Sequence, residues 1–198
     1  MVNYSSGLVS QSFWFLEFKK LLIQQNNGKT EEDIKKICIE ENILGISNEI
    51  RRKRVYGYLK NRLKYLNDDL IKIFLNTNVT TQKIICFICI LKENRLLFEF
   101  MYEVYREKAL LGYEILEDKD ILIFFKNKQN QDKNIAKWTD KTLKRLKGSY
   151  SNFLLESNLI SLKGNKKFIN KQVLDLQLEE YLKNNNEIKI LKSLIGEI

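Results

Sequence analysis

Apolar residues recur at helical spacing along almost the whole chain, whose 198 residues include no proline. Spacings of three and four residues place such side chains on one face of an α-helix. The first stripe of this kind consists of Phe13, Leu16, Phe18, Leu21 and Leu22. The pattern predicts a mainly α protein with a compact multi-helix fold.

Polar residues that favour helix starts divide the pattern into segments. Thr30 with Asp33 approximates a capping box for a helix to about Asn42, and Ser47 precedes a basic helix to about Leu66. Further starts are expected at Asn67, Thr80 or Thr81, Asn94, Asp118 with Asp120, and Thr139. Two more helices are expected at about 170–184 and 187–195.

The segment 159–169 has a different character. Two short runs, 159–162 and 166–169, flank Lys163-Gly164-Asn165, which is typical of a β-hairpin. Helix, turn, helix and hairpin is the element order of a winged helix-turn-helix. We therefore expect two helix-turn-helix-like regions, around 30–66 and 117–170, with the hairpin as a candidate wing of the second.

The chain divides accordingly into two predicted regions. Residues 1–91 form an N-terminal helical region with the first motif, and 92–198 form a C-terminal helical region with the second. The length suits one compact unit or two small ones, so both regions can pack as one globule.

Composition excludes several classes of catalytic site. Without histidine there is no Ser-His-Asp triad, Cys-His pair or imidazole metal ligand, and three cysteines cannot make a four-thiolate zinc site. Cys86 and Cys89 lie in an apolar stretch and are interpreted as buried, and Glu99, Glu103 and Glu107 as a solvated or partner-facing acidic stripe. We expect no enzymatic activity, no cofactor and no metal.

The hydropathy pattern, the N-terminal segment and the cysteine count predict a cytoplasmic protein with no membrane association. The longest apolar run, 84–91, has eight residues, whereas a helical span needs roughly 20. The N-terminus lacks the basic and apolar regions of a signal peptide. Three cysteines make a poor disulfide framework, in keeping with a reducing compartment.

Positive charge is concentrated at both ends. The net charge of +9 divides into +5 for 1–66, −2 for 67–132 and +6 for 133–198. Such ends attract a polyanion such as nucleic acid. Frequent Lys, Asn and Ile also fit an AT-rich genome, but this does not explain the arginines bunched at 51, 52 and 54.

Two predicted helices each present a basic face opposite an apolar one. Acidic partners at helix spacing are lacking on the first, where only Glu49 precedes the cations. Each face contains a glycine, Gly57 or Gly148, which suits close approach either to a phosphate backbone or to another helix. Arg52 and Arg62 point to the apolar side, where we expect buried carboxylates to hold them. The alternative interpretation is that each basic face is an ordinary solvated helix surface that binds no ligand.

The candidate DNA-contacting residues follow from these faces and from the hairpin tip. They are Lys53, Arg54, Lys60, Asn61, Lys64, Lys137, Lys141, Lys144, Arg145, Asn152, Lys166 and Lys167. Most of these cations are expected to contact phosphates, which gives salt-sensitive binding with weak sequence preference.

Several short segments carry a family resemblance. They are Tyr4-Ser5-Ser6-Gly7-Leu8 with Ser12-Phe13 and Glu17; Ser47 with Arg52; Leu96-Leu97-Phe98-Glu99-Phe100 with Glu103-Val104; Phe124-Phe125 with Lys128; Trp138 with Thr142 and Leu146; and Leu154-Leu155-Glu156 with Leu159-Ile160. In this order and spacing the chain resembles the BrxA proteins, the small subunit of BREX (bacteriophage exclusion) phage-defence systems.

The resemblance implies a helical, non-catalytic protein that binds double-stranded DNA. It would act beside a DNA methyltransferase, ATPases and other defence components. Two alternatives stay open: an adaptor that docks onto the methyltransferase or ATPases, and an RNA-binding, antitermination-like protein.

Overall fold

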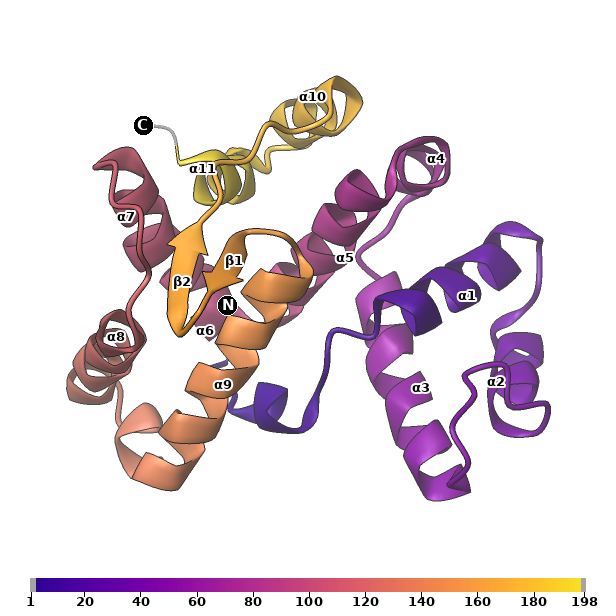
Figure 1. Cartoon of the computed structure of the whole chain (residues 1–198). Coiled ribbons are helices and arrows are strands. Elements are labelled where there is room, and N and C mark those ends of the chain that lie inside the picture. The colour runs from indigo at the N-terminus through magenta and orange to yellow at the C-terminus, as the bar shows by residue number, and fades with distance from the viewer. Residues whose placement is uncertain (1–2, 197–198) are drawn as a thin grey trace.

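The computed structural model describes residues 3–196, and most of its helices begin at a polar capping residue (Figure 1). The α-helices are α1 Phe15–Asn26, α2 Glu31–Ile39, α3 Glu49–Leu63, α4 Asp68–Asn76, α5 Val79–Glu93, α6 Arg95–Phe100, α7 Arg106–Leu110, α8 Asp118–Gln131, α9 Asp140–Glu156, α10 Leu176–Asn184 and α11 Ile188–Ile195. Shorter elements are the 3₁₀ turns η1 Gly7–Ser10 and η3 Ile135–Lys137, and the π-helical turn η2 Met101–Tyr105. The mainly helical prediction is confirmed.

The caps explain where the helices begin. Thr30 accepts a hydrogen bond from the backbone N–H of Asp33 at 3.1 Å, and Asp33 accepts one from the backbone N–H of Thr30 at 3.0 Å, so the capping box is confirmed. The predicted start of α3 was one residue early: Asn48, not Ser47, caps it by accepting from the backbone N–H of Arg51 at 2.8 Å.

A second start is also shifted by a residue or two. Asn78 accepts from the backbone N–H of Thr81 at 3.0 Å, so α5 begins at Val79 instead of at Thr80 or Thr81. In both cases an asparagine side chain in extended backbone reaches the third helical N–H, a geometry typical of helix caps.

Helix α5 forms the centre of the core. Residues 84–91 are all buried, and in Figure 1 the helix runs diagonally through the middle, with α1–α3 on one side and α6–α9 on the other. Buried residues from Leu8 to Leu194 form one apolar cluster. The division at 91/92 stays a prediction.

The hairpin prediction is confirmed and extended by one more pairing. Strands β1 Ile160–Lys163 and β2 Lys166–Ile169 pair antiparallel, with Ile160 opposite Ile169. Ile115, before α8, bridges to Phe168, and the N–H of Leu116 donates to the carbonyl of Lys167 at 2.9 Å. Because a pairing this short carries no alternation pattern, the sequence did not predict it.

Candidate nucleic-acid interface

Helix α3 exposes basic residues, but two of them are ion-paired. Lys53 Nζ lies 2.6 Å from Glu49 Oε1 one turn earlier, and Lys60 pairs with Glu31 of α2. The prediction concerned acidic partners at helix spacing, and within α3 only Glu49 is such a partner. Lys60 is instead neutralised from another helix, by a carboxylate 29 residues away in sequence.

The other candidates on α3 face solvent. Arg54 is exposed and has no acidic partner within residues 3–196. The ammonium group of Lys64 donates to Asn61 Oδ1 at 3.1 Å, and both residues are exposed. Arg54, Asn61 and Lys64 are thus available to an external ligand.

Arg62 points to the apolar side, as predicted, but different groups hold it there. Its side chain is buried, donating through Nη1 to the carbonyl of Phe13 at 2.6 Å and through Nη2 to the carbonyl of Ser12 at 2.9 Å and to Gln11 Oε1 at 3.0 Å. The expectation that carboxylates hold Arg52 and Arg62 was wrong: backbone carbonyls accept from both, since Arg52 Nη1 donates to the carbonyl of Ile46 at 3.4 Å.

Helix α9 and the turn η3 before it carry the larger unpaired set of cations. Lys137, Lys141 and Lys144 are exposed without an acidic partner in the described part of the chain, and Asn152 is exposed further along. Arg145 Nη2 donates to the carbonyl of Val9 at 3.3 Å. Its remaining donors stay accessible, because the side chain is exposed.

The two helical glycines are not there for helix packing. A methyl group added at Gly57 or Gly148 would meet no atom of another element within 4 Å among the residues described. Of the two explanations offered above, close approach to another helix of this chain is therefore wrong. Close approach to a phosphate backbone stays a prediction.

The hairpin contributes fewer free cations than expected. Lys167 and Lys147 of α9 both pair with Asp118, and their hydrogen bonds hold the pKa of that carboxyl below its ordinary value. Lys163 lies over the ring of Phe168 at 5.1 Å, and Lys166 is exposed. Asp118 thus fixes the hairpin against α8 and α9.

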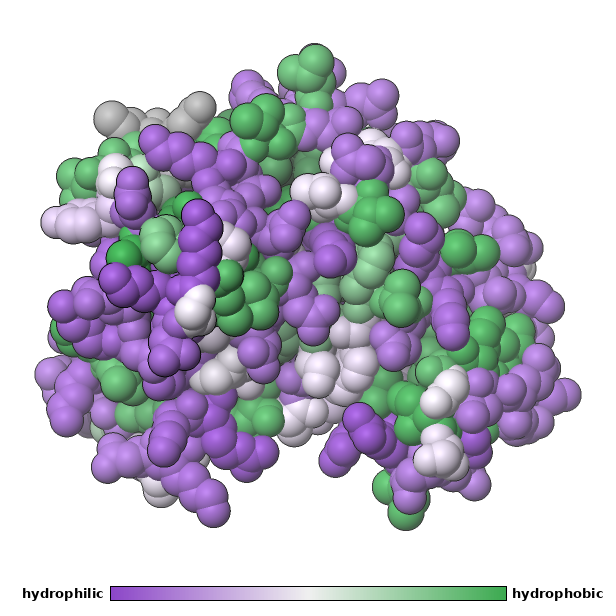
Figure 2. Space-filling view, in the orientation of Figure 1, coloured by the Kyte–Doolittle hydropathy of each residue, from purple (hydrophilic) through white to green (hydrophobic). Residues whose placement is uncertain are grey.

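The N-terminal segment connects the two basic helices. Val9 accepts from Arg145 of α9, while the hydroxyl groups of the adjacent Ser10 and of Tyr58 of α3 lie 2.9 Å apart. Trp14 stacks on Tyr58 with ring centroids 5.8 Å apart. In Figures 1 and 2 the N-terminal ends of α3 and α9 project at the lower edge on either side of an indentation in the molecular outline.

Among the described residues, no group of three or more His, Cys, Asp or Glu side chains is arranged to hold a metal ion. The three cysteines are buried and free, and burial raises the pKa of Cys38 to about 11 and that of Cys86 to about 12. Within residues 3–196, each helix is too short or too polar to cross a bilayer.

Comparison with known proteins decides the family. Residues 2–186 match the sequence profile of the BrxA family. The chain belongs to the BrxA family. A relative from Bacillus cereus (strain H3081.97), described as "BREX protein BrxA", is 36% identical over 195 residues, which cover 98% of this chain and 97% of the relative.

The fold is also found in a solved structure. The crystal structure of an uncharacterized protein from Magnetospirillum magneticum superposes with a TM-score of 0.83 at 20% identity, covering 99% of this chain and all of the other. At this identity the likeness shows that the fold is shared, and it says nothing of activity.

Several residues that carry the BrxA resemblance meet in one ion-pair cluster. The Tyr4 hydroxyl donates to Glu99 at 2.9 Å, Arg95 lies 2.7 Å from Glu99, and the buried Lys128 lies 2.6 Å from Glu99 and 2.7 Å from Glu103. The interpretation of Glu99, Glu103 and Glu107 as a solvated or partner-facing acidic stripe was wrong for Glu99, which Lys128, 29 residues later, neutralises. Glu103 also pairs with Lys128 but is about half exposed, and Glu107 is exposed, as that interpretation expected. In this BrxA-family chain the cluster ties α6 to α8 and to the N-terminus.

Proposed function

We propose that this BrxA-family protein is a non-catalytic, cytoplasmic, double-stranded DNA-binding component of a BREX phage-defence system. Its partners would be the methyltransferase and ATPases of that system. The observation that carries the proposal is that α3 and α9 both present exposed cations and are both joined to residues 9–14, so that one duplex can meet the two helices together.

The element order of the C-terminal half supports a winged helix-turn-helix. Helix α7, the short pairing at Ile115, helices α8 and α9, and the hairpin follow each other as in that motif. There the second helix enters the major groove and neighbouring elements contact the backbone. Lys141, Lys144 and Arg145 would then lie along the groove, with Lys166 near an adjacent phosphate strand.

The N-terminal half supports a second contact. Helices α2 and α3 pack on each other after α1, and Arg54, Asn61 and Lys64 face outward from α3. Two weak contacts held in one rigid body bind more tightly than either alone. Phosphate contacts would dominate, so sequence preference would be modest.

Anisotropy of a fluorescein-labelled DNA duplex, titrated at several salt concentrations, tests the proposal. We expect a log–log salt slope of several units, because each neutralised phosphate releases about 0.9 of a counterion. If saturating protein does not bind the duplex at ~50–100 mM salt, DNA binding is contradicted, because even nonspecific DNA-binding proteins remain bound at that salt concentration. An excess of unlabelled duplex RNA that competes as well as DNA would favour the RNA-binding alternative.

The adaptor alternative has one observation in its favour. Lys53, Lys60 and Lys167, three of the predicted contacts, are already neutralised within the chain. A complex with the other BREX components that survives nuclease treatment, combined with no DNA binding, would select the adaptor. Complex formation together with salt-dependent DNA binding would support both roles.

A further inference from the structure

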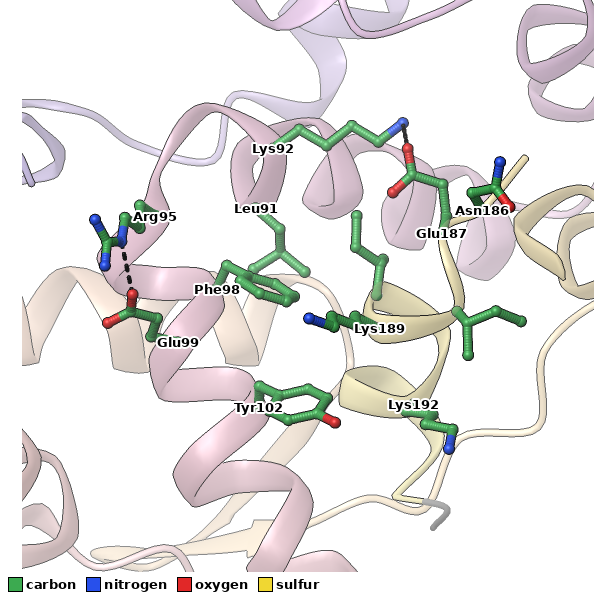
Figure 3. A pocket seen from close by; sticks show the side chains of 12 residues that line it. Leu91, Lys92, Arg95, Phe98, Glu99, Tyr102, Asn186, Glu187, Lys189 and Lys192 are labelled. Carbon is green, nitrogen blue, oxygen red and sulfur yellow. Dashed lines mark hydrogen bonds and ion pairs between the residues drawn. The ribbon is translucent and has the colours of Figure 1, made fainter. Parts of the chain in front are cut away.

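A groove of about 840 Å³ lies away from the basic helices, between α6–η2 and α11 (Figure 3). Leu91 at the end of α5, Phe98 of α6 and Tyr102 of η2 form one wall, and residues 186–192 form the other. In Figure 1 helix α11 is at the top of the molecule, whereas the N-terminal ends of α3 and α9 are at the bottom.

The floor of the groove is aromatic and aliphatic. The rings of Phe98 and Tyr102 are neighbours on one helical face, with centroids 6.0 Å apart, and both are half-buried. Ile188 on the opposite wall is 40% exposed. Apolar surface of this kind, rimmed by polar side chains, is typical of sites that bind another molecule.

The rim carries uncompensated positive charge. Both acidic residues of the groove are already paired: Glu187 lies 2.9 Å from Lys92, and Glu99 is neutralised by the cluster described above. Lys189 and Lys192 have no acidic partner among residues 3–196. Figure 3 shows Lys189 extending from α11 toward Phe98 and Tyr102.

We propose that this groove binds an acidic peptide segment of a partner protein, with an apolar side chain on Phe98 and Tyr102 and carboxylates on Lys189 and Lys192. A groove between two helices suits an amphipathic helix or extended segment with one or two apolar anchors. Charge complementarity selects acidic flanks and rejects basic ones. The proposal is independent of DNA binding.

Two other occupants fit less well. Two common nucleotide-binding motifs cradle the phosphates with a glycine-rich loop, and none of the groove-lining residues is a glycine. A second copy of this chain carries a net charge of +9 and is repelled by the positive rim.

One wall of the groove lies outside the part that matches the family profile. The match ends at residue 186, and α11 begins at Ile188. The aromatic wall therefore belongs to the matched region, while the two lysines do not. The alignment with the Bacillus cereus relative, 195 residues long, nevertheless includes α11.

Selection from a yeast-displayed library of random peptides, about 12 residues long and thus ~18 Å as a helix, tests the proposal without a known ligand. The full chain is the bait. We expect enrichment of sequences that combine Asp or Glu with Leu, Phe or Trp. A synthetic peptide from that pool should lose about tenfold or more in affinity for K189E/K192E and for Phe98→Ala, but not for the matched reversal K72E/K171E on exposed lysines elsewhere.

Three results would overturn the proposal. They are no enrichment of any peptide, enrichment of peptides without acidic residues, and peptide binding that K189E/K192E does not weaken. Tight binding of ADP in the same groove, or concentration-dependent dimerisation abolished by K189E/K192E, would replace the peptide by a nucleotide or a second copy. Because K189E/K192E leaves α3 and α9 intact, its DNA affinity reports separately on the proposed function.

Discussion

The guanidinium group of Arg62 donates a 2.6 Å hydrogen bond to the carbonyl oxygen of Phe13, 49 residues earlier in the chain. With its bonds to Ser12 and Gln11, this contact fixes the N-terminal segment against α3. Trp14, the next residue, adopts a left-handed backbone conformation and stacks on Tyr58. A buried arginine thus positions the segment that links the two basic helices.

Replacing Arg62 by methionine should destabilise the protein by about 2–4 kcal/mol. The substitution fills most of the volume but leaves two carbonyl acceptors without donors, and each such loss costs about 1–3 kcal/mol. Urea unfolding followed by circular dichroism measures the change. Arg54→Met on the exposed face of the same helix is the control, with an expected change within about 0.5 kcal/mol. Equal stability of the two variants would contradict the role given to Arg62.

Replacing Lys141, Lys144 and Arg145 together by alanine should weaken DNA binding to a similar degree for all sequences. If these cations contact phosphates, the log–log salt slope should flatten by roughly 2–3 units. The charge-matched control is Lys72, Lys171 and Lys183 to alanine, three exposed lysines outside α3 and α9. An unchanged slope, with the melting temperature preserved, would refute the assignment of α9.

Glu99→Gln should make the free energy of unfolding less dependent on pH in the acid range. Partial burial raises the pKa of Glu99, but hydrogen bonds from Lys128, Arg95 and Tyr4 outweigh burial and lower it below 4.5. The carboxylate therefore stabilises the fold fully above pH 4.5, and this contribution disappears as the pH falls through the lowered pKa.

The difference in unfolding free energy between wild type and Glu99→Gln should be largest near pH 7, about 1–3 kcal/mol for a partly buried ion pair. It should shrink below pH 4.5. Glu107→Gln, at an exposed position on α7, is the control and should show no such trend. A difference that is constant from pH 7 to pH 3 would refute the role of the charge.

The three cysteines should be inert in the folded protein. Because burial raises the pKa of Cys86 to about 12 and that of Cys38 to about 11, thiolate is scarce at pH 8. Reaction with Ellman's reagent should proceed only as fast as the protein unfolds, whereas all three thiols should react at once in guanidinium chloride. A thiol that reacts rapidly in the native protein would contradict this prediction and would support a redox role for Cys86 and Cys89.

The sequence by itself determined most of the helices, most of their caps and the hairpin, although the helix expected at about 170–184 begins only at Leu176. These features depend on contacts within about four residues along the chain, so periodicity and capping residues such as Thr30 and Asn94 are sufficient to predict them. The burial of Cys86 and Cys89 followed in the same way from a continuous apolar run.

Only the tertiary structure decided which charged residues are free. Lys60 is neutralised by Glu31, Lys167 by Asp118 and Glu99 by Lys128, all partners at least 29 residues apart in sequence. Periodicity gives the direction of a side chain from its own helix, but an ion pair depends on what the neighbouring element presents. For the same reason, the anchoring of residues 9–14 by Arg62 and the groove beside α11 were visible only after the helices had packed.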